Sequence, residues 1–197
     1  MDTEITAQII LSDGREGSAY TYKIKEYVDY ILDNKGDYAK ETIELVEAMS
    51  DFGDYATAYF SDESIDEIPE EMLAVTSETL KGYQGELPKN NIYYGSSLLL
   101  KSETVLRHYF TEQVEGSINK GNLYYIDYAG IAAHKLGDDI ETTVKTTEGD
   151  ITITYNPLSY AYIALSKDGV DENLRSLMRA MYLYYQTALA YLETTAN

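Results

Sequence analysis

Apolar residues recur at helical spacing in two long stretches of the chain, residues 38–60 and 172–192. Their spacings of three and four residues draw one stripe along a helix. Burying such a stripe contributes roughly 1.5–3 kcal/mol per large side chain, so each helix needs a partner surface. We expect the two stripes to face each other or a shared sheet. The predicted stripes are Leu45, Ala48, Met49, Phe52, Ala56 and Tyr59, and Leu177, Met178, Met181, Tyr184, Ala188 and Tyr191.

A shorter helix and a pair of strands precede each long helix. The first short helix is predicted over residues 24–32, before Asn34-Lys35-Gly36, and the second over residues 158–165, with Pro157 in its first turn. The strand pairs are predicted around turns typical of hairpins. They span residues 7–11 and 18–22 around Ser12-Asp13-Gly14, and residues 142–147 and 151–155 around Glu148-Gly149-Asp150.

The two stretches align with each other without a gap. Ala48-Met49 falls on Ala180-Met181, and dropping one loop residue extends the match back to Tyr22 and Tyr155. This pattern indicates a duplicated unit, residues 7–60 and 141–192, which is a statement about architecture and not about catalysis. With a spacer between the copies, we expect one interlocked domain over residues 1–197.

The segment between the copies is rich in predicted strands, over about residues 90–140. Strands are expected at residues 92–100, 104–110 and 122–128, with a short helix before them at about 70–80 and a helical turn at 131–136. The predicted fold class is therefore α+β, with an antiparallel β-sheet or sandwich of about seven strands and two duplicated helical hairpins.

Charge and composition exclude several functions. The 34 acidic against 15 basic residues give a formal charge of −19, which opposes binding to nucleic acid or to an anionic membrane surface. No apolar run is long enough to insert into a membrane. The chain has no cysteine, which excludes disulfides, thiolate metal sites and cysteine nucleophiles.

The residues that could carry chemistry form no recognisable site. His108 and His134 have no carboxylate or second histidine at ligand spacing, and no glycine-rich phosphate loop or hydrolase elbow is present. Pairs of acids are expected by chance among so many. We therefore predict no catalytic residues, no cofactor and no metal, and a protein that is not an enzyme.

Four acids form a line on the first long helix, opposite its apolar stripe. Their spacings of three, four and three residues stack them along the helix, whereas the second copy has Ser176, Arg179, Leu183 and Gln186 at these positions. The line is either a solvated face or a docking face for a basic partner. A second candidate surface is formed by the tyrosines of the predicted strands, Tyr93, Tyr94, Tyr124 and Tyr125. The candidate partner-binding residues are Glu44, Glu47, Asp51 and Asp54.

Four separated phrases resemble a known kind of module. They are EYVDYILDN, ELVEAMSDFGDYATAYF, GSSLLLKSETVLRHYF, and NPLSYAYIAL with RAMYLYYQTALAYL. Together they are similar to a module repeated in large secreted or wall-attached proteins of gut Firmicutes such as Ruminococcus and its Lachnospiraceae relatives. Some members of this kind are immunoglobulin-binding surface proteins, described as B-cell superantigens. The resemblance implies an extracellular location and a binding role, and it transfers no site residue.

Three functional hypotheses follow. The first is a non-catalytic surface module that binds a host protein, with immunoglobulin variable domains as the class that the resemblance implies. The second is a glycan-binding module of a fibre-degrading surface system, against which the absence of tryptophan counts although 21 tyrosines are present. The third is a structural spacer. The pattern of residues identifies neither the ligand nor the oligomeric state.

Overall fold

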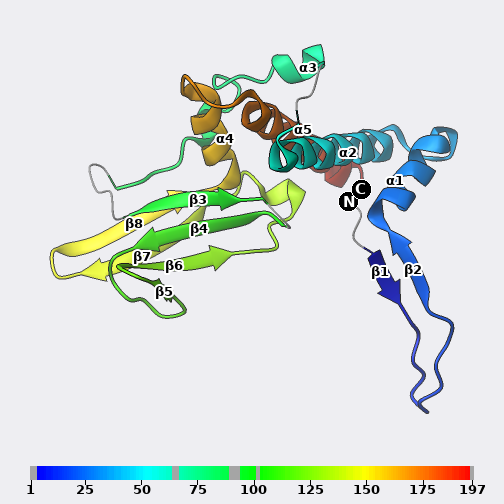
Figure 1. The fold of residues 1–197 in the computed structure, drawn as a ribbon, viewed down its shortest axis with the longest axis horizontal. Coiled ribbons are helices and arrows are strands. Elements are labelled where there is room, and N and C mark those ends of the chain that lie inside the picture. Colours follow the sequence, from blue (N-terminus) through cyan, green and yellow to red (C-terminus); the bar gives the residue numbers. More distant parts are fainter. Residues whose placement is uncertain (1–3, 64–66, 89–93, 101–102, 196–197) are drawn as a thin grey trace.

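The computed structural model describes residues 4–63, 67–88, 94–100 and 103–195, and it has an α+β fold with antiparallel strands (Figure 1). The predicted fold class is confirmed. The N-terminal elements are β1 (Glu4–Ala7), β2 (Tyr20–Lys23), α1 (Ile24–Asp33), η1 (Lys35–Asp37) and α2 (Lys40–Ser61). The middle elements are α3 (Glu70–Leu73), η2 (Lys81–Tyr83), β3 (Gly95–Leu99), β4 (Val105–Phe110), β5 (Ile118–Lys120), β6 (Leu123–Tyr128) and η3 (Ala133–Lys135). The C-terminal elements are β7 (Ile140–Thr146), β8 (Gly149–Tyr155), α4 (Pro157–Ser166) and α5 (Glu172–Thr195).

The N-terminal and C-terminal units repeat one order of elements, a hairpin followed by a short and a long helix. The short helices α1 and α4 have 10 residues each, and the long helices start at the aligned residues Lys40 and Glu172. Both short helices also start with a hydrogen bond from the backbone amide of the preceding residue to a side chain three residues later. The amide of Lys23 donates to Glu26, and the amide of Asn156 donates to Ser159 Oγ, each over 3.2 Å.

The long helices α2 and α5 pack side by side and run in opposite directions (Figure 1). Asn173, at the start of α5, donates a hydrogen bond of 3.0 Å to the carbonyl of Glu63, just past the end of α2. The two hairpins consequently project from opposite ends of the helical layer.

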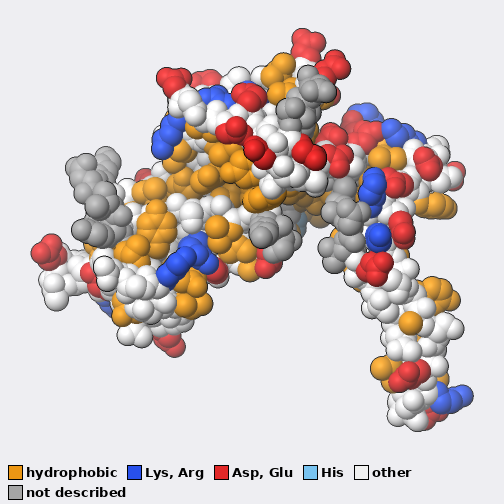
Figure 2. All heavy atoms as spheres, viewed as in Figure 1, with side chains coloured by type: hydrophobic (Ala, Val, Ile, Leu, Met, Phe, Trp, Pro, Cys, Tyr) orange, Lys and Arg blue, Asp and Glu red, His pale blue; other side chains and the backbone are white. Residues whose placement is uncertain are grey.

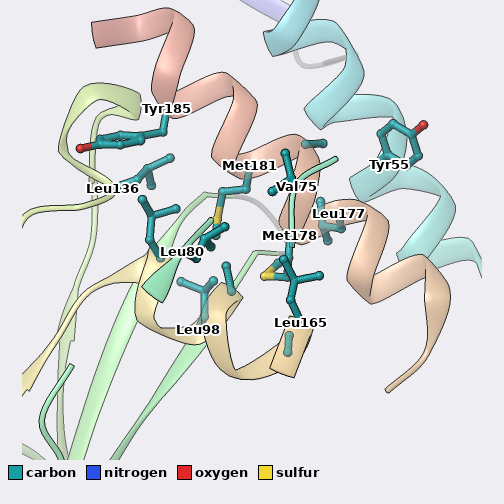
Figure 3. Packing of buried hydrophobic residues seen from close by; sticks show 14 of the residues in the cluster. Tyr55, Val75, Leu80, Leu98, Leu136, Leu165, Leu177, Met178, Met181 and Tyr185 are labelled. Atoms are coloured by element: carbon teal, nitrogen blue, oxygen red, sulfur yellow. The ribbon is translucent and has the colours of Figure 1, made fainter. Parts of the chain in front are cut away.

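The main core lies around α5, α4 and the C-terminal half of α2. Met181, Leu80 and Leu136 meet there with almost no exposed surface (Figure 3). A separate small cluster joins Val28 and Ile31 of α1 to Val46 of α2. The helix α2 therefore buries more than the single predicted stripe, because α1 and α5 pack on different sides of it. The most buried residues of α2 are Val46, Ala48, Tyr55 and Ala58, whereas the predicted Leu45, Met49, Phe52, Ala56 and Tyr59 are half-buried.

A four-stranded antiparallel sheet, in the order β3-β4-β6-β5, lies beside the helices. The hairpin β7–β8 packs on one face of it, where Val144 and Ile153 join Tyr94 and Phe110 in a second cluster. The described residues hold eight strands, one more than expected, because the three-residue β5 was not predicted. The expected strand at 92–100 starts at Gly95 here, and residues 92 and 93 lie outside the described part.

The predicted helix at 70–80 is much shorter than expected, since α3 ends at Leu73. The amide of Thr76 donates to the hydroxyl of Thr79 over 3.1 Å, an alternative to helical bonding that such side chains favour. The chain then turns along β8, where Glu86 and Thr154 exchange two backbone hydrogen bonds of 2.6 and 2.8 Å. Gly85 permits this approach, because a Cβ there would lie 2.7 Å from the ring of Tyr155 and its φ is +64°.

Candidate functional site

The hairpin β1–β2 stands apart from the rest of the fold (Figures 1 and 2). It forms a two-stranded sheet of its own, and every residue from Glu4 to Tyr22 is exposed. A hairpin of this size is marginally stable in water unless another surface packs on it. Its isolation is therefore a feature that needs an explanation.

One face of this hairpin is apolar and the other is polar. The register pairs Ile5 with Tyr22 and Ala7 with Tyr20 on one face. On the opposite face Thr6 and Thr21 lie across from each other, with their hydroxyl oxygens 2.9 Å apart. We name the set Ile5, Ala7, Tyr20 and Tyr22 the N-terminal apolar face.

The hairpin β7–β8 has the same register and the same two-faced pattern. Ile140 pairs with Tyr155, and Thr142 pairs with Ile153, at the positions that Ile5–Tyr22 and Ala7–Tyr20 occupy in the first unit. Its polar face likewise carries facing threonines, with the oxygens of Thr143 and Thr152 separated by 3.2 Å.

The apolar faces of the two hairpins differ sharply in solvent exposure. Tyr20 is 72% exposed and its counterpart Ile153 is 0% exposed. Tyr22 is 44% exposed, whereas its counterpart Tyr155 is 2% exposed. Since a large exposed apolar patch on a folded protein commonly marks an interaction site, the N-terminal apolar face is the strongest candidate for a functional surface.

Further apolar side chains are exposed in the same unit. Ile10 and Leu11, near the tip of the hairpin, are 66% and 46% exposed, and Tyr27 and Tyr30 of α1 are 58% exposed each. Figure 2 shows hydrophobic side chains as separate orange groups along the projecting arm. The tip itself is polar, because Arg15 forms an ion pair with Asp13.

The predicted acidic line does lie along α2, but half of it is neutralised. Lys40 contacts Glu44 over 2.7 Å, and Lys35 forms an ion pair with Glu47. Asp51 and Asp54 are exposed. Partial burial, followed by the charges of Asp54, Glu47 and Glu71, raises the pKa of Asp51. The crowded part of the line is thus its Asp51–Asp54 end, and its role in partner binding stays a prediction.

The second predicted surface, the tyrosines of the strands, is not a continuous surface. Tyr94 is buried and its hydroxyl bonds with Glu112, because Tyr94 belongs to the cluster under β7–β8. Tyr124 pairs with Phe110 on that same covered face, whereas Tyr125 lies on the opposite face. Tyr93 lies outside the described residues. The expectation that these tyrosines form one binding surface is therefore wrong for Tyr94.

The outer face of the sheet carries a hollow of about 320 Å³ lined by Arg107, Tyr109, Lys120, Leu123, Tyr124 and Tyr125. The guanidinium carbon of Arg107 lies 3.9 Å from the centre of the Tyr125 ring, and Asp127 holds the same guanidinium over 2.7 and 2.8 Å. One face of the Tyr125 ring is consequently already occupied, which leaves less flat aromatic surface for a sugar.

The two histidines have different surroundings. His108 is fully buried, and its Nδ1 lies 2.8 Å from the hydroxyl of Thr142, which also contacts the Tyr128 hydroxyl over 2.7 Å. Burial lowers the pKa of His108 to about 4, so the ring is neutral at pH 7. His134 lies in η3 and is half-buried. The described residues contain no group of three His, Cys, Asp or Glu that could hold a metal ion.

Sequence reasoning missed the N-terminal apolar face because the first strand was expected at residues 7–11, whereas β1 spans Glu4–Ala7, so that Ile5 lay outside the predicted hairpin. The sequence did carry one signal for it. The hairpin and the two helices occur twice, whereas the β-rich insert occurs once.

Within the described part of the chain, none of the helices is long and apolar enough to cross a membrane. Comparison with known proteins found no family model, curated protein or solved structure that matches the chain.

Proposed function

We propose that the chain is a non-catalytic module that binds a protein partner, and that it does so outside the cell. The observation that carries the proposal is the N-terminal apolar face, whose counterparts Thr142, Ile153 and Tyr155 in the second unit are buried. Burying apolar surface contributes about 25 cal/mol per Å², so an uncovered face of this kind favours association with another protein.

The tyrosines support a protein partner over a small molecule. Tyr20, Tyr22, Tyr27 and Tyr30 expose large, rigid rings, and such rings are enriched at protein interfaces because they offer much contact area at low entropic cost. The resemblance to surface modules of gut bacteria supplies the partner class to test first, a host protein and in particular an immunoglobulin variable domain.

The test is binding of the full chain to purified polyclonal immunoglobulin and its Fab and Fc fragments, by surface plasmon resonance. We expect binding to Fab, and a loss of at least tenfold in affinity for Tyr20→Ser, because Tyr20 presents most of its ring to solvent. Asp51→Lys on the acidic line is the matched control. A larger loss for Asp51→Lys than for Tyr20→Ser would transfer the binding surface to the acidic line.

A glycan-binding module is the second candidate, and the hollow beside Arg107 and Tyr125 is the observation that favours it. A glycan array on the same protein tests it directly. Glycan binding that is lost in Tyr109→Ala, together with no binding to Fab, would replace the protein partner by a carbohydrate.

A further inference from the structure

We infer that the N-terminal apolar face docks the face of an antiparallel β-sheet of a separate protein module. This inference rests on the proposed protein-binding function and specifies the partner. The second unit shows how such a face is covered, because the equivalent face of β7–β8 packs against the sheet β3-β4-β6-β5.

The sheet surface that covers β7–β8 is uncharged. Alternate residues of β4 and β6 point to this side, as their register and the burial of Leu106, His108 and Phe110 show. On β6 the corresponding positions are Tyr124, Ile126 and Tyr128. A partner for the N-terminal apolar face would therefore present aliphatic and aromatic side chains, without a charged group, over about the width of two strands.

One difference between the hairpins refines the chemistry of the partner. Thr142 in the covered hairpin accepts or donates hydrogen bonds with His108 and Tyr128, and its counterpart in the N-terminal hairpin is Ala7. A histidine facing Ala7 would lose its partner, and an unpaired buried polar group costs about 1–3 kcal/mol. The docked sheet is therefore apolar at this point, unlike the sheet of this chain.

The edge of the hairpin offers a second contact. Thr154 of β8 exchanges two backbone hydrogen bonds with Glu86, whereas its counterpart Thr21 belongs to a sheet of two strands only. The amide and carbonyl of Thr21 are thus available for pairing with an added strand, which is a recurring mode of protein recognition. In the second unit, the sheet β3-β4-β6-β5 covers the face of the hairpin and the segment before β3 extends its edge. The partner does both for the hairpin β1–β2.

The inference can be tested with a covering sheet supplied by the chain's own sequence. A second copy of residues 84–138 is joined directly to the first residue of β1. The added segment then precedes Ile5 at the same spacing at which residues 84–138 precede Ile140. Because the chain lacks cysteine, Tyr20→Cys introduces a unique thiol on the N-terminal apolar face, and Thr6→Cys introduces one on the opposite face as a control. The measurement is the rate of thiol labelling in the full chain with and without the added segment.

We expect the added segment to slow labelling of Tyr20→Cys at least tenfold in an Ala7→Thr background, because this substitution restores the hydroxyl that His108 and Tyr128 bond in the second unit. With Ala7 unchanged the effect should be smaller, because the buried histidine is left unpaired. Labelling of Thr6→Cys should not change in either background. Unchanged labelling of Tyr20→Cys in both backgrounds overturns the inference.

Two further outcomes separate this inference from the proposed function. If the chain binds Fab but hydrogen exchange protects a surface other than residues 4–23, the docking face is wrong while the binding function stands. If Fab does not bind but the added sheet protects Tyr20→Cys, the docking face is supported and the immunoglobulin class is wrong. Light scattering of the chain alone that reveals a dimer abolished by Tyr20→Ser would identify a second copy as the occupant and overturn a separate partner.

Discussion

The rings of Phe52 and Tyr184 stack on each other with centroids 5.7 Å apart and planes inclined by 24°. These two residues occupy the same position in the two copies of the repeated unit, one on α2 and the other on α5. The antiparallel α2–α5 contact thus brings two aligned positions of the long helices into direct contact.

The ring pair should show energetic coupling. We expect the double-mutant cycle of Phe52→Ala and Tyr184→Ala to give a coupling free energy of about 0.5–1.5 kcal/mol in urea unfolding, which is typical of packed aromatic pairs. Tyr27→Ala, on the exposed side of α1, serves as a control and should be additive with Tyr184→Ala. Strict additivity of Phe52→Ala and Tyr184→Ala would contradict the packing.

The equivalent methionines should differ in their contribution to stability. Met181 is fully buried between Leu80 and Leu136, so Met181→Ala should cost about 2–5 kcal/mol in free energy of unfolding (Figure 3). Met49 is half-buried at the edge of the α1–α2 cluster, so Met49→Ala should cost clearly less. Equal costs, measured by urea unfolding of both variants, would argue that the two cores are alike.

Stability should fall below neutral pH because of His108. Its pKa is about 4 in the folded chain, where burial disfavours the cation, against about 6.5 for an unperturbed histidine. The unfolded chain therefore binds the proton more readily between these values. The stability that this residue contributes is fully present above pH 6.5 and is lost as pH falls towards 4, by up to about 3 kcal/mol.

The measurement for His108 is the free energy of unfolding from pH 7.5 to 4. The variant His108→Gln, which keeps a polar group for Thr142 but does not titrate in this range, should have a flatter profile than the parent chain. His134→Gln should keep the parent slope. A parent profile that matches His108→Gln throughout would show that the ring is accessible to protons in the folded state.

Removing one charge from the acidic line should stabilise the fold. Asp51 lies near Asp54 and Glu47, and its raised pKa reflects burial and these neighbours. Like charges at such spacing cost about 0.2–0.5 kcal/mol per pair, so Asp51→Asn should raise the melting temperature slightly at pH 7. Glu47→Gln is the contrasting variant, because it removes the ion pair with Lys35 and should bring no gain. A lower melting temperature for Asp51→Asn would place that carboxylate in a favourable contact.

Much of the fold could be predicted from the sequence because the local signals agree with one another. The helical spacing in residues 38–60 and 172–192 and Pro157 at a helix start both indicate elements that the structure contains. The three-residue strand β5 was missed because so short a segment carries no period. The width of the buried surface of α2 depends on α1 and α5 packing on it, and such tertiary contacts leave no pattern within α2 itself.

The candidate surface could be predicted only in part. The acidic line was identified from helical spacing, but its pairing with Lys35 depends on η1 folding back towards Glu47, which the spacing does not encode. The alternation of Ile5, Ala7, Tyr20 and Tyr22 marks an apolar face equally well whether it is buried or not. Whether such a face is exposed depends on what packs against it, and the two hairpins differ in this respect.

The isolation of the hairpin β1–β2 also has a consequence for its motions. Local unfolding of a segment with few buried contacts requires little free energy, so the amides of β1 and β2 should exchange with solvent long before those of β7 and β8. A partner that docks there would have to order the arm as well as desolvate it. Its binding would then show a large unfavourable entropy and a negative heat-capacity change, the signature of coupled ordering and apolar burial.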